Sequence, residues 1–398
     1  MYQGASDHNA VVDDGGLKTS WRFDAGAKIN GALAFAGRTL FVDTFNGDLI
    51  ALDARTGGQM WRAHMGNVLM STPVVYRGLV YVGSGRDGFL TSSATHRSVV
   101  SPVAGHLWGR PEGDEFAAFD AQTGALKWSY RTIGQDMPSP AISNGLLIFA
   151  NGDGHAYALH ASSGKLVWKR ALHGISTMAS ANAAGGRVFI SICDYVPHRN
   201  PPCETDALDA RSGTTSWRAP YGNADAAPSY AGGRIFVSGL DRPTRYLGGR
   251  GIVAALDAQR GRLVWLYRTP TIGTLTAVGS GEVAVAGTYA SGTYYQAIPT
   301  QDEFIAFDAG TGRVRWTRHS MGPIKMSAVL RGGKIYVGDI AGVFYVLDAQ
   351  SGRLLNITLS REPFSVAPPL IAGDTLFFVN GSKVYAVPLA NLPVRGGL

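Results

Sequence analysis

The sequence predicts an all-β protein: a closed β-propeller of eight four-stranded blades. Two observations lead to this fold class. One short phrase recurs along the 398 residues, and recurrence at a regular interval is typical of repeat architectures. In addition, the strands at the two ends of the chain each form part of a blade, and together they make one complete blade. We therefore expect the last blade to be closed by the N-terminal strand that carries Trp21.

The repeated phrase is a strand ending in Leu-Asp-Ala or Phe-Asp-Ala, then a turn of the form x-Thr/Ser-Gly, then a strand that carries Trp. Its copies begin at Ala51, Ala118, Leu159, Leu208, Leu256, Phe307 and Leu347. An Asp side chain can bond backbone groups two residues further on, and Gly accepts a positive φ, so the phrase predicts a tight turn. The Trp is large enough to pack one blade against the next, and we assign it no ligand role.

Two further strands precede each phrase, as in Pro73–Gly78 and 79–83. Each unit therefore has four strands, A to D, with the Trp on strand D, which is the pattern of a propeller blade. The eight predicted D positions are Trp21, Trp61, Trp128, Trp168, Trp217, Trp265, Trp316 and Asn356.

Both chain ends fit one closing blade. Trp21 lies on a D strand with no A to C strands before it, and Pro369–Val387 supply A, B and C strands with no D strand after them. Joining them removes both sheet edges, which would otherwise invite aggregation. We expect a lead-in segment at 1–16, a single propeller domain at 17–390 and a tail at 391–398.

Four B–C connections are long, at about 84–114, 193–205, 239–251 and 287–302. B–C and D–A loops emerge on the same face of a propeller, and long loops on a rigid scaffold often carry function. Their aromatic content, with Trp108 and Tyr195 among it, is unlike that of disordered linkers. We therefore expect a cap over the central channel, and the exposed aromatic side chains would also allow a homodimer through these insertions.

The D–A loops should line the mouth under this cap. Most residues there are apolar or small, and Asp225 and Lys325 are the exceptions. A charge in a partly dry funnel is costly unless it is paired or used. Two interpretations stay open: an ion pair across the channel, or a general base (Asp225) with an anion anchor (Lys325). Asp136 is a weaker catalytic candidate, and His173 is either a surface histidine or a substrate ligand.

Three methionines share one D–A position in consecutive repeats: Met70, Met137 and Met178. They either pack beneath the cap or form a soft surface suited to a sulfur substrate or Cu(I). We count them with Tyr195 and Trp108 as candidate substrate-binding residues. We predict no metal site.

Charge and composition limit the partners. The net charge of +7 favours anions, but Lys and Arg are spread over all repeats, so no nucleic-acid stripe is predicted. No apolar run approaches the roughly 20 residues that span a bilayer. The expected partner is a small anionic substrate.

Cys193 and Cys203 are the two cysteines of the chain and share one Pro-rich stretch. This placement favours a loop-closing disulfide and an oxidising compartment, with two free thiols as the alternative. We expect a periplasmic or extracellular protein whose export signal has been trimmed from the chain.

The Leu-Asp-Ala-x-Thr-Gly-x-x-x-Trp phrases resemble the PQQ-like (quinoprotein-type) propeller superfamily over nearly the whole chain. Within it, Gly134–Pro140, Asn151–His155 and Asp225 before Pro228 look like the tetrathionate hydrolases. That branch is exported, has no essential PQQ and is thought to use an acidic residue in the funnel. The resemblance implies an enzyme that hydrolyses a polythionate in the central funnel with carboxylate-activated water.

Two other branches stay as alternatives. BamB is a lipoprotein scaffold of similar length that binds a protein partner, although its loops are modest. Quinoprotein dehydrogenases bind PQQ and Ca²⁺, and many have adjacent cysteines under the cofactor, whereas Cys193 and Cys203 are separated along the chain. No cofactor is firmly implied, and PQQ with calcium remains an alternative.

Overall fold

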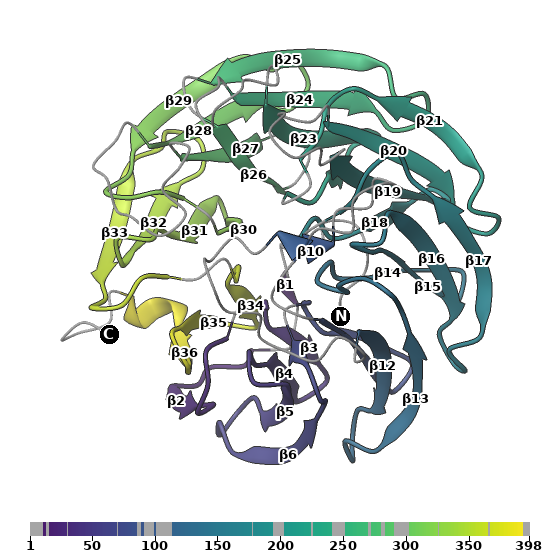
Figure 1. The fold of residues 1–398 in the computed structure, drawn as a ribbon. Coiled ribbons are helices and arrows are strands. Elements are labelled where there is room, and N and C mark those ends of the chain that lie inside the picture. Colours follow the sequence, from purple (N-terminus) through teal and green to yellow (C-terminus); the bar gives the residue numbers. More distant parts are fainter. Residues whose placement is uncertain are drawn as a thin grey trace.

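The fold was examined in a computed structural model, in which strands follow one another around a central axis (Figure 1). The described residues are 11–12, 16–29, 31–69, 71–85, 89–90, 99–100, 114–176, 178–193, 203–223, 226–240, 251–269, 272–279, 283–289, 302–324, 326–364 and 367–392. Nearly all regular structure among them is β-strand, and one short 3₁₀ helix, η1 (Leu389–Asn391), lies near the C-terminus.

Seven sheets are each built from one continuous stretch of chain, and we call them blades I to VII. Blade I contains β3 (Ala34–Ala36), β4 (Thr39–Asp43), β5 (Asp48–Asp53) and β6 (Gln59–His64). Blade II contains β7 (Val68–Leu69), β8 (Val74–Tyr76), β9 (Leu79–Gly85), β12 (Glu115–Asp120) and β13 (Leu126–Arg131). Blade III contains β14 (Ala141–Ser143), β15 (Leu146–Ala150), β16 (His155–His160) and β17 (Leu166–Ala171).

The next four blades follow the same order of strands. Blade IV contains β18 (Asn182–Ala184), β19 (Arg187–Cys193), β20 (Cys203–Asp209) and β21 (Thr215–Ala219). Blade V contains β22 (Ser229–Ala231), β23 (Arg234–Leu240), β24 (Gly251–Asp257) and β25 (Leu263–Thr269). Blade VI contains β26 (Ile272–Gly279), β27 (Val283–Tyr289), β28 (Glu303–Asp308) and β29 (Val314–His319). Blade VII contains β30 (Val329–Arg331), β31 (Lys334–Gly338), β32 (Val343–Asp348) and β33 (Leu354–Leu359).

The remaining sheet, here called the closing sheet, is made from both ends of the chain. Its strands are β34 (Leu370–Ala372), β35 (Thr375–Asn380), β36 (Lys383–Pro388), β2 (Trp21–Asp24) and β1 (Val11–Val12). Strand β2 pairs antiparallel with β36, with Trp21 opposite Ala386. Strand β1 pairs in parallel with β34 at the other edge. Both edge strands of this sheet therefore come from the N-terminal part of the chain.

The prediction of eight four-stranded blades is wrong. Seven blades are continuous in sequence, six of the sheets have four strands, and blade II and the closing sheet have five. A separate hairpin of β10 (Phe89–Leu90) and β11 (Val99–Val100) adds one more sheet among the described residues. The additional strands β1 and β7 have two residues each. Alternation of apolar and polar residues cannot be recognised over so short a run.

The repeated phrase makes the contact between neighbouring blades. The indole of Trp61 in blade I donates a hydrogen bond to Ala121 O in the turn of blade II, at 3.1 Å. In the same turn Gly124 has φ of 73°, and a Cβ placed on it would lie 2.7 Å from the Trp61 ring. Only Gly accepts both this backbone and this approach without strain. The same indole bond runs from Trp21, Trp128, Trp168, Trp217, Trp265 and Trp316 to Ala54, Ala161, Ala210, Ala258, Ala309 and Ala349.

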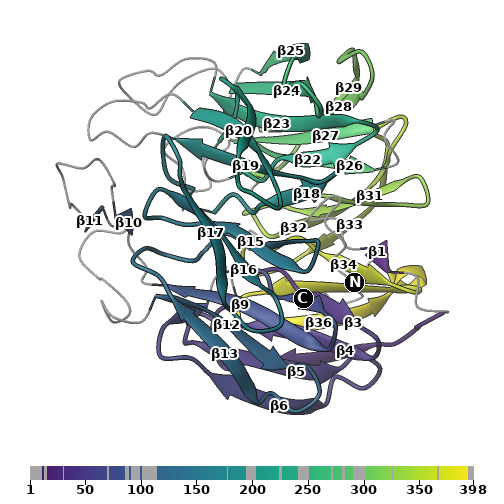
Figure 2. The same ribbon diagram turned by 90° about the vertical axis from the view of Figure 1, so that its right-hand side faces the viewer.

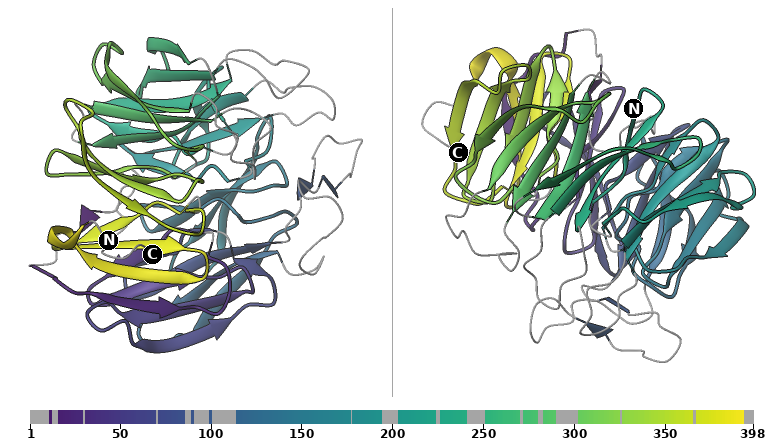
Figure 3. Two further views of the ribbon diagram at one scale, coloured as in Figure 1. Left: turned by 90° about the vertical axis from the view of Figure 1, so that its left-hand side faces the viewer. Right: turned by 90° about the horizontal axis from the view of Figure 1, so that it is seen from above.

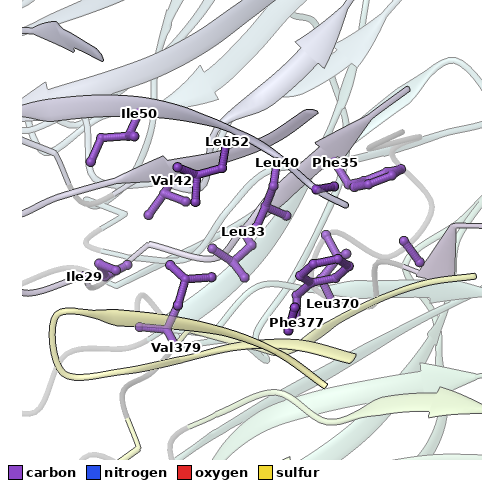
Figure 4. Packing of buried hydrophobic residues seen from close by; sticks show 14 of the residues in the cluster. Ile29, Leu33, Phe35, Leu40, Val42, Ile50, Leu52, Leu370, Phe377 and Val379 are labelled. Carbon is purple, nitrogen blue, oxygen red and sulfur yellow. The ribbon is translucent and has the colours of Figure 1, made fainter. Parts of the chain in front are cut away.

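Apolar side chains fill the space between adjoining sheets. Figure 4 shows this packing where blade I meets the closing sheet: Leu40 and Val42 of β4 lie beside Phe377 and Val379 of β35. Side chains that alternate between the two faces of a strand bury one set against each neighbour. The propeller therefore has a chain of cores between sheets rather than one central core.

Four connections between second and third strands are long: β9 to β12, β19 to β20, β23 to β24, and β27 to β28. All second strands run in the same direction across the ring, so these connections leave on one side, which we call the insertion face. Strands β10 and β11 project from this side (Figures 2 and 3). The D–A loops end on the same face.

Candidate functional site

Buried side chains occupy one equivalent position in the loops of the insertion face. Each belongs to a D–A loop and lies eight residues after the D-strand Trp, or after Asn356 in blade VII. Six of these residues, which we call the collar, are Ile29, Leu69, Asp136, Ser176, Ile324 and Phe364, each at most 2% exposed. Asp136 is the one carboxyl group among these six residues. Most of the other D–A loops have an apolar side chain at the equivalent position.

The loops around Asp136 bond both of its oxygens. Asn151 Nδ2 donates to Asp136 Oδ1 at 2.6 Å and to Gly134 O at 2.9 Å. Thr132 Oγ1 lies 2.5 Å from Asp136 Oδ2 and 3.1 Å from Gly134 O. Thr132 and Gly134 precede Asp136 in the loop between β13 and β14, whereas Asn151 follows β15 of blade III. The carboxyl group therefore ties a D–A loop to the neighbouring B–C turn.

Burial favours the neutral form of Asp136. Burial raises the pKa of Asp136 well above its usual range, and the nearby Asp114 and Asp153 raise it further, against the lowering effect of Thr132 and Asn151. A hydroxyl group has one hydrogen. When Thr132 donates it to Gly134 O, a protonated Asp136 can donate to Thr132, so the neutral form satisfies the whole network.

Gln135 lies next to this acid and is 2% exposed. Neither its Nε2 nor its Oε1 has a hydrogen-bond partner in the described part of the protein. A buried amide without partners costs free energy, and such groups are often found where a ligand or water completes the site. Gln135 is thus an unsatisfied donor and acceptor beside Asp136.

A second polar cluster lies on blade IV. The Nε of Arg218 is 3.3 Å from Asp206 Oδ2 and 4.0 Å from Glu204 Oε1, and His173 Nδ1 is 3.3 Å from the same Glu204 oxygen. Burial and the Glu204 charge raise the pKa of Asp206 to about 6, although Arg218 and His173 act to lower it. This carboxyl group therefore changes charge in a mildly acidic range.

The disulfide Cys193–Cys203 adjoins the blade IV cluster and confirms the predicted pairing. The two residues are directly opposite each other where β19 pairs with β20, and the bond closes the connection between these strands. Glu204 and Asp206 follow on β20. The cross-link therefore fixes the base of one insertion next to the carboxylates.

Two other buried carboxyl groups lie near the ends of B strands on the insertion face. Both oxygens of Asp43 on β4 lack a hydrogen-bond partner among the described residues, and burial raises the pKa of Asp43 well above its usual range. Asp339 after β31 is different: Tyr345 Oη donates to its Oδ2 at 2.7 Å, and the amide of Gly322 does so at 3.0 Å. Burial also raises the pKa of Asp339.

The candidate residues predicted from sequence divide into two groups. Asp225, Lys325, Met70, Tyr195 and Trp108 lie outside the described residues. The other candidates belong to the described residues. Met137 is 5% exposed and directly follows Asp136, and Met178 is partly buried. His173 contacts Glu204. The structure thus places Asp136 with Met137 on one loop and His173 in a separate cluster on blade IV.

Sequence reasoning missed several residues of these two clusters: Thr132, Glu204, Asp206 and Arg218. Asp43 could have been found by comparing the repeats. It is the last residue of its B strand, whereas the equivalent strands of blades III and VII end in the small residues Ala150 and Gly338. The same comparison identifies Asp225 as a charged residue at the collar position, because it lies eight residues after Trp217.

In the described part of the chain, no group of three or more His, Cys, Asp and Glu side chains is placed to hold one metal ion. No helix among the residues described has the length and apolarity needed to cross a bilayer.

A ring of sheets joined by Asp-Ala-x-Thr-Gly turns and their tryptophans defines a propeller of the PQQ-like class. The family model described as outer membrane protein assembly factor BamB matches residues 10–193 and 204–392. The chain belongs to this PQQ-like propeller family, and the predicted resemblance is confirmed.

The relatives of this chain include both enzymes and assembly factors. The chain is 25% identical to tetrathionate hydrolase of Acidithiobacillus ferrooxidans over 354 residues, covering 86% of this chain and 69% of that protein. It is 27% identical to tetrathionate hydrolase of Acidianus ambivalens, covering 88% and 68%. BamB of Burkholderia pseudomallei is 22% identical, covering 85% and 79%.

Solved structures show the same fold. The crystal structure of BamB from Moraxella catarrhalis superimposes with a TM-score of 0.66 at 17% identity, covering 92% of this chain and 98% of that one. Quinohemoprotein alcohol dehydrogenase from Comamonas testosteroni gives a TM-score of 0.66 at 11% identity, covering 95% and 78%. The disulfide and the similarity to envelope proteins are consistent with an exported protein.

Proposed function

We propose that the protein is an exported hydrolase that acts on a small sulfur oxyanion of the tetrathionate type at the insertion face. The observation that carries this proposal is the fully buried carboxyl group of Asp136, the pKa of which is raised by burial, in an otherwise largely apolar collar. Support also comes from the two tetrathionate hydrolases, which align with 86% and 88% of the chain. A net charge of +7 favours the approach of a dianion.

Asp136 acts in this proposal as a positioning residue. Its side chain is fully buried and bonded to Thr132 and Asn151, so it holds the loop that carries Gln135 and Met137. Burial raises the pKa of this carboxyl group, and its neutral form would not repel an incoming dianion as an ionised carboxylate would. The unsatisfied amide of Gln135 is then free to bond a substrate oxygen, and Met137 supplies a polarisable neighbour for sulfur.

Asp225 and Lys325 take the reacting roles. Asp225 has the same spacing from its Trp as Asp136, and in the proposal it accepts a proton from the attacking water. The water oxygen forms a bond to a sulfur atom while one S–S bond breaks, and the leaving sulfur group takes the electron pair. No oxidant or reductant is needed. Lys325 holds a sulfonate group of the substrate.

The test is release of sulfur and thiosulfate from tetrathionate. We expect the wild-type protein to hydrolyse tetrathionate, and Asp225→Asn to lose about 10²–10⁴-fold in turnover, the usual contribution of a general base. Lys325→Met should raise KM more than it lowers kcat, because an anchor binds substrate and transition state alike.

The matched control is Glu362→Gln, which removes an exposed carboxylate of the same face whose side chain is 52% exposed. It should keep wild-type turnover. A wild-type protein that leaves tetrathionate intact would overturn the proposed function. Full turnover by a folded Asp225→Asn protein would remove Asp225 from the mechanism.

A non-catalytic scaffold is the second candidate function, and exposed apolar side chains favour it. Ile133 and Met321, in D–A loops of the insertion face, are 72% and 65% exposed, and such residues can contact a partner protein. A partner that binds equally well to wild type and Asp225→Asn, but not to Ile133→Asp with Met321→Asp, would support this role.

A further inference from the structure

A pocket of about 380 Å³ lies on the face opposite the insertions. Its polar lining residues are Lys18, Arg331, Lys334, Tyr336 and Asp374, and Pro388–Ala390 form an apolar wall. None of these residues belongs to the collar or to the clusters on the insertion face. The pocket is therefore separate from the proposed hydrolytic site, and the inference below does not rest on the proposed function.

Three parts of the chain that are distant in sequence build this pocket. Lys18 lies in the segment that leads into β2, and Arg331 and Lys334 flank the turn between β30 and β31. Asp374 lies between β34 and β35, and Pro388 ends β36. Strands β2 and β36 are the pair that joins the two chain ends. The pocket thus lies at the seam between blade VII and the closing sheet.

The backbone around the pocket is already bonded. Arg331 donates to Gly373 O, and the amide of Asp374 donates to Leu17 O at 2.8 Å. These bonds connect the turn of blade VII to the closing sheet and the closing sheet to the N-terminal segment. The walls therefore keep their arrangement without a ligand, which lowers the ordering cost of binding.

The charges of the pocket are unbalanced. Lys18, Arg331 and Lys334 supply three positive charges, and Asp374 supplies one negative charge. Among the described residues, none of the three cations forms an ion pair with a carboxylate. Lys18 and Lys334 are exposed, so their ammonium groups can turn toward a ligand. Burial raises the pKa of Tyr336, so its hydroxyl group stays protonated and remains a donor.

We propose that this pocket binds a doubly charged oxyanion group, the chemistry shared by sulfate, hydrogen phosphate and a phosphate headgroup. Such a group accepts hydrogen bonds from ammonium and guanidinium groups together, and its charge offsets the local excess of two. Bound between Lys18, Arg331 and Lys334, it joins the N-terminal segment to blade VII across the seam. Binding to the folded ring alone stabilises the ring by mass action.

Thermal unfolding with sodium sulfate or phosphate tests this inference. Up to 10 mM anion is added in a buffer whose ionic strength is held constant with sodium chloride, because higher sulfate stabilises proteins in general. We expect the midpoint temperature to rise and to saturate at millimolar anion. Lys18→Gln with Lys334→Gln should abolish the rise while tetrathionate hydrolysis, where present, stays unchanged.

The matched control is Lys28→Gln with Lys165→Gln, which removes two exposed lysines outside the pocket and changes the net charge equally. This control should keep the saturable rise. An equal rise in both double variants would show an effect of charge or of salt and would overturn the proposal. No rise in the wild type would also overturn it.

Vesicles separate the two sources of the oxyanion group. Sedimentation with vesicles rich in phosphatidic acid, compared with phosphatidylcholine alone, shows whether a headgroup can enter the pocket. Binding by the wild type and by the Lys28/Lys165 control, but not by the Lys18/Lys334 variant, assigns a lipid source. A sulfate response without vesicle binding assigns a free anion.

Discussion

Asp43 is an unpaired carboxyl group within a well-packed blade. Its oxygens have no partner among the described residues, and an added Cβ on Gly31 would overlap its Oδ1, so the side chain lies against the adjoining D–A loop. Ionising a buried group of this kind is costly. Because burial raises the pKa of Asp43 in the folded state, the contribution of this residue to stability is most favourable below about pH 4, the unfolded value, and falls as pH rises.

We expect Asp43→Ala to stabilise the protein at pH 7.5, because the equivalent position of blade III already holds Ala150. The gain should shrink at about pH 3, where the carboxyl group is largely neutral in both states. Thermal unfolding of both proteins at the two pH values measures this. Asp374→Ala, at an exposed position, serves as the control. An equal difference between wild type and Asp43→Ala at both pH values would contradict the electrostatic explanation.

At the residue scale the sequence predicted little of the site's geometry. Asp136 could be named from its loop, but its bond to Asn151 depends on a B–C turn that approaches only in the folded blade. The Cys193–Cys203 pair was predictable because few residues separate the cysteines. Contacts between loops carry no periodicity, so sequence alone does not reveal them.

At the scale of elements, each D strand depends on one Trp. Trp265 on β25 is 8% exposed, donates to Ala309 O at 3.0 Å and stacks on Phe307 with ring centroids 5.5 Å apart. It therefore joins blade V to blade VI. The repeated phrase predicted this contact, because a large residue after a tight turn recurs at the same place in every complete copy.

We expect Trp265→Ala to destabilise the protein by about 3–5 kcal/mol, the usual effect of emptying a buried aromatic site. Leu263→Ala on the same strand is the control, because Leu263 is 43% exposed and its truncation should cost below about 1 kcal/mol. Denaturant midpoints of the two variants provide the comparison. Similar midpoints would show that the indole does not hold the blades together.

Some elements escaped prediction for a physical reason. Strand β33, which holds Asn356 in place of Trp, was predicted from the preceding turn alone. Strands β1 and β7 were not, because each forms only two register pairs with its neighbour. Such short strands form only because the tertiary fold places them next to a longer strand. The local sequence therefore contains no signal for them.

At the scale of the whole molecule, closure depends on contacts between the two chain ends. Thr375 Oγ1 donates to Leu17 O at 2.9 Å and accepts from the amide of Thr19 at 3.1 Å. Trp21 and Phe377 pack with centroids 5.7 Å apart. The ends were predicted to meet because each held an incomplete blade, whereas the five-stranded sheet that results could not be counted from the repeat.

Removing residues 1–24 should leave β36 as an unpaired edge, which is a template for association. We expect this truncated protein to elute as oligomers or aggregates in size-exclusion chromatography. Removing residues 1–10 alone keeps β1 and β2 and should preserve the elution volume of the full chain. A monomeric, folded 25–398 protein would show that β2 is dispensable for closure.

The pairing of β2 with β36 also orders events in time. Trp21 is synthesised before its partner Ala386, and all seven continuous blades lie between them in sequence. Until β36 has been made, β2 lacks its pairing partner and the ring cannot close. Folding of such distant contacts is slow, and a nascent propeller is therefore exposed to misassembly throughout its synthesis.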